Sequence, residues 1–135
     1  MVNKKIIGLV IDYTNNILNE SESDKAILHD RLTGLYNRET FLRKVDNLLK
    51  KGVECGVFAI VDIDNLKYVN DMHGHGVGDN YIKNMAMALK EFDKYGLICR
   101  KNGDEFYMFL HKFSSLEEAI NVIESISKDI RSKGV

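Results

Sequence analysis

The sequence predicts an α/β (α+β) domain in which helices pack on one sheet, and three observations support that fold class. Residues 56–63 form a near-continuous apolar run, which is typical of a strand buried on both faces. Residues 97–110 read as a hairpin, because turn residues join an apolar run to an alternating one. Helical stripes lie between and around these strands. The length of 135 residues corresponds to one domain.

The chain begins with an imperfect helical stripe between residues 4 and 29. It predicts an N-terminal helical lead-in over residues 1–29, ahead of a domain over residues 30–135. A turn-rich segment follows, and then a clear amphipathic helix with Gly52 as its natural C-terminal stop. The apolar face of that helix holds Phe41, Leu42, Val45, Leu48 and Leu49.

The strand over residues 56–63 is followed by a short helix, expected over residues 65–72. A glycine-rich bend over residues 74–79 then leads into a longer helix. The inward side chains of that helix are expected to be Ile82, Met85, Ala86, Leu89 and Phe92.

The hairpin turn is expected at Asn102-Gly103, because both residue types accept the positive φ of a two-residue turn. Ser115 and Glu118 have the spacing of a capping box and predict the start of the last helix. Its expected core face is Leu116, Ala119, Ile120, Ile123, Ile126 and Ile130.

Strand, helix, hairpin and helix in this order make up a βαββα core, which is most of a ferredoxin-like βαββαβ unit. The last strand of that unit has no counterpart before Val135. The strand that ends at Asp62 is expected to be central and buried. The missing partner would leave it unpaired on one side.

Composition limits the possible functions. The net charge of −1 supplies no basic stripe for nucleic-acid binding. Cys55 and Cys99 both lie in apolar, strand-like runs and are expected to be buried free thiols in a reducing cytosol. The apolar run over residues 6–11 is too short for a membrane span, so the expected location is cytoplasmic.

Carboxylates at strand ends are the first candidates for chemistry. A buried carboxylate is costly unless it is paired or bound to a cation. Asp62, the carbonyl of Ile63 and Asp104 would offer hard oxygen ligands to Mg²⁺ or Mn²⁺ if their strands are neighbours. The alternative is that Asp62 caps the following helix. An EF-hand is excluded, because no glycine stands at the sixth loop position.

A second group of candidates lies around the glycine-rich bend. Asp79 could accept hydrogen bonds from guanine-type N–H donors, and Asn70 could share that task. Alternatively, Asp79 is the N-cap of the next helix. Lys67 is either a phosphate contact or a solvated helix residue. His73 and His75 could suggest a zinc cluster, but no fourth ligand is clear.

Residues 30–38, 62–71, 74–79 and 100–106 form four motifs that together resemble the GGDEF family, the diguanylate cyclases. Residues 30–38, DRLTGLYNR, match D-x-L-T-G-L-x-N-R, and residues 62–71, DIDNLKYVND, are similar to D-x-D-x-F-K-x-x-N-D. Residues 74–79, GHGVGD, fit G-H-x-x-G-D, and residues 100–106, RKNGDEF, are similar to R-x-G-G-D-E-F. The resemblance runs from about residue 30 to the end of the chain.

The resemblance implies a palm-like sheet on which two GTP molecules become cyclic di-GMP and two pyrophosphates, across two facing domains of a homodimer. It implies that Asp62, the Ile63 carbonyl and Asp104 bind the cation, and that Glu105 supports the site. Asp104 would also help deprotonate the 3′-hydroxyl. The resemblance further implies guanine recognition by Asn70 and Asp79, a phosphate contact by Lys67, and nucleotide contacts at Asn102 and Gly103. An upstream sensor domain is a further possible partner.

The chain departs from the family pattern at three places. Asn102 replaces a glycine, Leu66 replaces the usual Phe, and the family's last strands and helix have no counterpart. Where the family's product-inhibition motif R-x-x-D would stand, residues 93–96 read DKYG, so inhibition by cyclic di-GMP at that site is expected to be absent. The alternative function is a degenerate, inactive GGDEF module that binds GTP or a partner protein in signalling.

Overall fold

The computed structural model describes residues 28–132, so almost all of the predicted helical lead-in over residues 1–29 lies outside the described residues. Residues 28 and 29 are not helical, and His29 forms an isolated antiparallel bridge with Tyr36. The elements in chain order are β1 (Tyr36–Asn37), α1 (Arg38–Lys50), β2 (Val57–Asp62), α2 (Leu66–His73), α3 (His75–Lys90), the 3-10 turn η2 (Asp93–Tyr95), β3 (Gly96–Asn102), β4 (Glu105–Leu110) and α4 (Leu116–Ser132).

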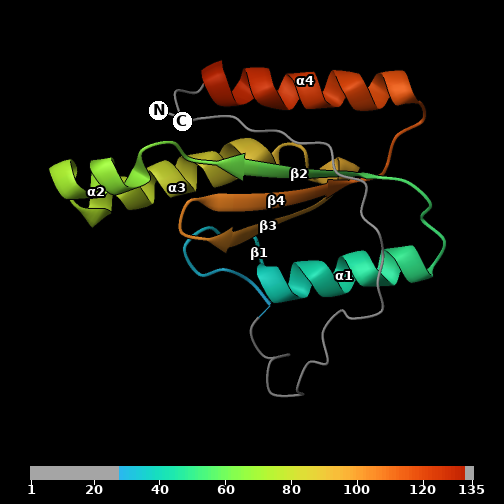
Figure 1. Ribbon diagram of the computed structural model, residues 1–135, viewed down its shortest axis with the longest axis horizontal. Coiled ribbons are helices and arrows are strands. Elements are labelled where there is room, and N and C mark those ends of the chain that lie inside the picture. The colour runs from blue at the N-terminus through green and yellow to red at the C-terminus, as the bar shows by residue number, and fades with distance from the viewer. Residues whose placement is uncertain (1–27, 133–135) are drawn as a thin grey trace.

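The four strands form one sheet in the order β1-β3-β4-β2 (Figure 1). β4 is antiparallel to both β3 and β2, which is the split βαβ arrangement of a ferredoxin-like core. The predicted βαββα order is therefore confirmed. The two-residue strand β1, which pairs parallel to β3, was not predicted, because so short a segment carries no periodicity.

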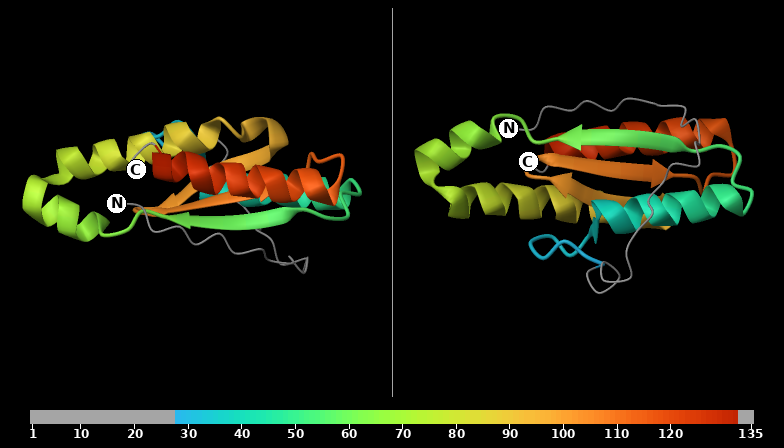
Figure 2. Two further views of the ribbon diagram at one scale, coloured as in Figure 1. Left: turned by 90° about the horizontal axis from the view of Figure 1, so that it is seen from above. Right: turned by 60° about the horizontal axis from the view of Figure 1, so that its bottom comes forward.

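Helices cover both faces of the sheet, α1 on one side and α3 with α4 on the other (Figure 2). Phe41 and Val45 of α1 pack against Phe58 and Phe109. On the opposite face, strand residues such as Val61 join the buried side chains of α3 and α4. Neighbouring residues of β2 thus enter different cores, which explains the near-continuous apolar run in its sequence.

The helices predicted before and after β2 are confirmed as α1, α2 and α3. Asn37 is the N-cap of α1, and its Oδ1 accepts a hydrogen bond of 2.8 Å from the backbone N–H of Thr40. Gly52, just beyond the end of α1, adopts a φ of +103°, which glycine reaches without strain. In α3, the predicted inward residues Ile82, Met85, Ala86 and Leu89 are buried. Phe92, predicted in the same helix, lies just beyond its end and is partly buried.

The prediction that β2 is central is wrong for the described part of the chain. Among residues 28–132, β2 pairs only with β4 and forms one edge of the sheet. The apolar run reflects the burial of β2 side chains under helices on both faces of the sheet. It does not indicate that β2 is hydrogen-bonded to a strand on each side. Within the described residues, the other side of β2 carries no strand, as expected for the sheet without the family's last strand.

The hairpin turn lies one residue later than predicted. Arg100 pairs with Phe106 and Asn102 pairs with Glu105, so β3 carries one extra residue, Lys101, opposite a single step of β4. This bulge makes Gly103 and Asp104 the two turn residues and leaves Asn102 as the last residue of β3. Neither Asn102 nor Gly103 has a φ in the left-handed region, so the predicted left-handed turn is also wrong.

The core face of α4 differs from the prediction. Ala119, Val122, Ile126 and Ile130 are buried, whereas Leu116 is 78% exposed. Ile120 is 48% exposed and Ile123 is partly buried. Two apolar stripes overlap on this helix, and contact with α3 and the sheet selects the one that contains Val122. At the N-terminus, Ser115 accepts from the Glu118 N–H, and the Glu118 carboxylate accepts from Ser114, close to the predicted capping box.

Two further predictions need correction. α3 begins at His75 and its N-cap is Gly74, so Asp79 lies inside the helix and is not its cap. The predicted glycine-rich bend is reduced to Gly74, with a φ of +88°, where α2 meets α3. Cys99 is a buried free thiol as expected, but Cys55 is exposed in the loop before β2. Within residues 28–132, the longest apolar helical stretches fall short of a membrane span.

Candidate functional site

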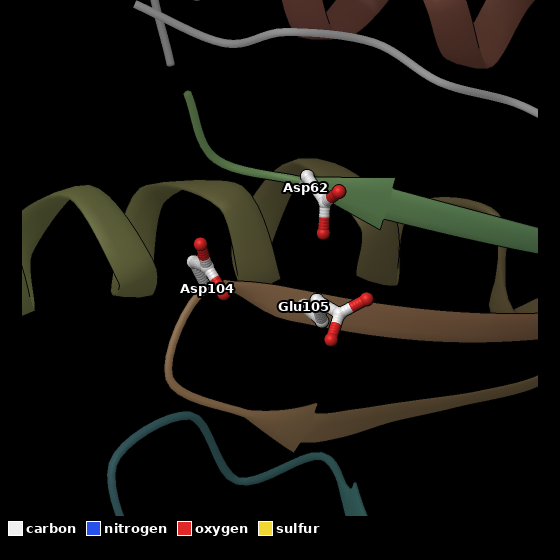
Figure 3. A group of neighbouring side chains, drawn as sticks. All are labelled: Asp62, Asp104 and Glu105. Atoms are coloured by element: carbon white, nitrogen blue, oxygen red, sulfur yellow. The ribbon is translucent and has the colours of Figure 1, made fainter. Parts of the chain in front are cut away.

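A group of three carboxylates forms where the end of β2 meets the β3–β4 turn (Figure 3). Asp62 is the register partner of Glu105, so both side chains leave the sheet on the same face. The backbone N–H of Ile63 donates a hydrogen bond of 2.9 Å to the carbonyl of Asp104, which ties the turn to the end of β2. Ligand oxygens of Asp62, Asp104 and Glu105 all lie within 4.8 Å of one another.

The chemistry of this donor set fits a hard divalent cation. The three side chains are only partly buried, and each supplies carboxylate oxygen, the ligand type preferred by Mg²⁺ and Mn²⁺. Like charges placed directly opposite each other on two strands are unfavourable unless they are compensated. In the described part of the chain this is the one group of three potential metal-binding side chains of its kind, and neither His73 nor His75 belongs to such a group.

Asn65 makes the sharp turn between β2 and α2. It adopts a left-handed φ of +61°, a conformation that Asn tolerates better than most residues. Its carbonyl accepts the first helical hydrogen bond, 3.0 Å from the Val69 N–H. α2 therefore begins within four residues of Asp62 and projects beyond the same end of the sheet that holds the carboxylates (Figure 1). Lys67 is exposed in the first turn of α2.

Asn70 lies against the first turn of α3. A Cβ atom added at Gly78 would lie 1.7 Å from Oδ1 of Asn70. The absence of a side chain at Gly78 therefore leaves the space that the Asn70 amide occupies. Oδ1 of Asn70 is buried and accepts no hydrogen bond from the described residues. Asp79 follows Gly78 directly, so the two residues predicted to read a guanine come from adjacent parts of the α2–α3 pair.

The motif over residues 30–38 has a structural role that its sequence does not reveal. Asp30 receives hydrogen bonds from the N–H and the hydroxyl of Thr33, at 2.9 and 2.8 Å. It also forms an ion pair of 3.2 Å with Arg100, whose other nitrogen donates to the carbonyl of Gly103 at 3.3 Å. Asp30 and Arg100 thus hold the hairpin tip. They are 70 residues apart, so no local pattern could have paired them.

Lys101 is a second residue that the sequence did not single out. The bulge places its Nζ 3.2 Å from Oε1 of Glu105 and 5.4 Å from the centroid of the Tyr107 ring. The pKa of Lys101 is raised, first by a hydrogen bond to the Tyr107 side chain and then by Glu105. One member of the carboxylate group therefore already has a cationic partner within the protein.

The hairpin tip itself is open. Asn102 and Gly103 are exposed, and a Cβ atom added at Gly103 would meet no atom within 4 Å. The tip lies beside the carboxylates and leaves space for a ligand.

The fold and this site together define the class of protein: an α+β domain with three clustered carboxylates where a hairpin turn meets a neighbouring strand end. Comparison with known proteins identifies the family. The family model described as diguanylate cyclase, GGDEF domain, matches residues 27–133. The chain belongs to the GGDEF family.

Individual relatives agree with this assignment. The chain is 34% identical over 109 residues to diguanylate cyclase DgcN of Escherichia coli, an alignment covering 77% of this chain and 26% of DgcN. It is also 34% identical over 119 residues to the response regulator PleD of Caulobacter vibrioides, with 85% and 26% covered. The aligned part is thus about a quarter of the length of these curated relatives.

Solved structures show the same fold. The GGDEF domain of DgcB from Caulobacter crescentus, crystallised with c-di-GMP, superposes with a TM-score of 0.67 at 27% identity, covering 78% of this chain and 63% of that chain. Diguanylate cyclase SiaD of Pseudomonas aeruginosa, in complex with its activator SiaC, gives a TM-score of 0.69 at 31% identity, with 81% and 43% covered.

Proposed function

We propose that this GGDEF domain binds GTP with a divalent cation, and that two copies condense two GTP molecules into cyclic di-GMP. The observation that supports this most directly is the convergence of Asp62, Asp104 and Glu105 within 4.8 Å at one end of the sheet. Mg²⁺, or Mn²⁺ in its place, would neutralise triphosphate charge and polarise the reacting phosphate when bound. Asp62, the Ile63 carbonyl and Asp104 would hold it, with Glu105 in support.

The remaining residues would position the nucleotide. Asp79 and Asn70 would accept and donate at the guanine edge, and Gly78 leaves the space that the Asn70 amide occupies. Lys67, exposed on the same projecting helix, would contact phosphate, and the open tip at Asn102 and Gly103 would lie against the nucleotide. Such positioning supplies much of the rate enhancement in phosphoryl-type transfers.

The reaction would require two domains that face each other. The 3′-hydroxyl oxygen of one GTP forms a bond to the α-phosphorus of the other, and pyrophosphate leaves. The hydroxyl proton passes to Asp104 acting as a base. A second bond, from the 3′-hydroxyl oxygen of the other nucleotide to the α-phosphorus of the first, closes the ring and releases the second pyrophosphate. Because one domain holds one nucleotide, a homodimer is the minimum active species.

The test is incubation of concentrated protein with GTP and Mg²⁺, with chromatographic separation of the products. We expect cyclic di-GMP from the unmodified chain and none from Asp104→Asn, which keeps the shape of the side chain but removes its charge. Asp93→Asn is the matched control, because Asp93 is exposed in η2, at the end of β3 remote from the turn. Equal product from Asp104→Asn would contradict the proposal.

The second candidate is a GGDEF module that binds GTP without turnover. Asn102 favours it, because this side chain stands next to the open tip where the family has a glycine. GTP binding measured by calorimetry without any product would support this candidate over the cyclase.

A further inference from the structure

One negative charge of the carboxylate group is compensated by a lysine of the protein itself, which the family motif does not predict. Three carboxylates lie together, yet Glu105 is paired at 3.2 Å with Lys101. Both side chains of this pair are 29% exposed, so the ion pair sits at the rim of the site. The two remaining carboxylates, Asp62 and Asp104, come from different strand ends and are joined through the backbone hydrogen bond at Ile63.

The position of Lys101 follows from the bulge in β3. Without the extra residue, the side chains of β3 would keep strict alternation up to the turn. The shift between Arg100 and Asn102 instead aims Lys101 at Glu105 and across the Tyr107 ring, at 5.4 Å from its centroid. Tyr107 is packed in turn against Phe58, at a ring distance of 4.9 Å. A packed aromatic ring therefore faces the Lys101 ammonium at this place.

We propose that Lys101 is a positioning residue that acts as a built-in counter-charge: its ammonium occupies the Glu105 carboxylate beside the other two carboxylates and thereby weakens the affinity of the site for the cation. The inference rests on the proposed cation site, which would then bind through Asp62, the Ile63 carbonyl and Asp104. A single ammonium close to a divalent cation in a partly exposed site lowers its affinity by roughly tenfold. Removing that ammonium would also release Glu105 as an additional ligand.

The experiment is a titration with Mn²⁺ alone, with free Mn²⁺ followed by electron paramagnetic resonance. We expect Lys101→Met to bind Mn²⁺ roughly tenfold more tightly than the unmodified chain. Lys101→Arg keeps the charge and is expected to leave the affinity unchanged. Lys94→Met is the matched control, since Lys94 lies over the Tyr95 ring at 5.1 Å and at the opposite end of β3.

A double-mutant cycle tests the role of Glu105. In the unmodified chain, Glu105→Gln is expected to weaken Mn²⁺ binding less than Asp104→Asn does. In the Lys101→Met background, Glu105→Gln is expected to remove most of the gain. Circular dichroism would verify that every variant is folded.

The possible failures are distinguishable. If Lys101→Met binds Mn²⁺ no more tightly while Asp104→Asn abolishes binding, the counter-charge role is refuted and the cation site stands. A gain that survives Glu105→Gln in full refutes the assignment of Glu105 as the released ligand. If neither the unmodified chain nor Lys101→Met binds Mn²⁺, the cation site fails, and the inference fails with it.

Discussion

Replacing Gly78 by alanine is expected to change the free energy of unfolding little and to weaken the binding of GTP more strongly. The new Cβ would lie 1.7 Å from Oδ1 and 2.8 Å from Cγ of Asn70. Carbon and oxygen in contact need roughly 3.3 Å, so the amide must move by about 1.6 Å. The displaced group is the end of a side chain, and alanine gains about 0.5–1 kcal/mol in a helix over glycine. We therefore expect only about 1–2 kcal/mol of destabilisation.

The effect on GTP binding is expected to be larger. If Asn70 reads the guanine as proposed, moving its amide would leave polar groups at the guanine edge unpaired, which would cost about 1–3 kcal/mol. This corresponds to a GTP dissociation constant about 5 to 150 times higher. Isothermal titration with GTP, and with ATP for selectivity, measures it.

The control for this substitution is Gly76→Ala in the same helix. A Cβ atom at Gly76 meets nothing within 4 Å, so this variant gains helix propensity without moving Asn70. Equal GTP affinity of Gly78→Ala and Gly76→Ala would refute the link between Gly78, Asn70 and guanine.

Three further predictions follow from contacts elsewhere in the fold. Asp30→Ala removes a partly buried ion pair with Arg100 and two hydrogen bonds from Thr33. Urea unfolding is expected to show a free energy of unfolding lower by about 1–3 kcal/mol. The comparison variant Lys50→Ala, whose side chain is 59% exposed, is expected to lower it by only about 0.5 kcal/mol. Gly96→Ala would place a Cβ atom 1.9 Å from a backbone carbonyl of β4, and a loss of about 3 kcal/mol is expected; the open Gly103→Ala should be nearly neutral. Burial raises the pKa of Cys99 to about 12, so one thiol should react with Ellman's reagent at pH 8 in the native protein and two after denaturation. Because the unfolded thiol ionises from about pH 9, this residue's contribution to stability is full below that pH and is lost as the pH rises toward 12; a native protein with two reactive thiols would contradict its burial.

The parts of the fold that the sequence predicts well are those with a local cause. The inward face of α3 follows from helical periodicity, and the end of α1 follows from the conformational freedom of Gly52. The β2 strand follows from its apolar run, although that run cannot distinguish a central strand from an edge strand covered on both faces. On α4 two apolar stripes were available. The choice between Ile120 and Val122 depends on packing against α3 and the sheet, which local sequence does not contain.

The sequence by itself determined the βαββα order of the core, the strand-end carboxylates Asp62 and Asp104, and membership of the GGDEF family. These features depend on residue type and on short-range spacing. The tertiary structure decided the bulge at Lys101, the pairing of Asp30 with Arg100, and the contact of Gly78 with Asn70. Each of these depends on the register or distance between segments that are separate in the chain, and such distances arise only when strands pair and helices pack.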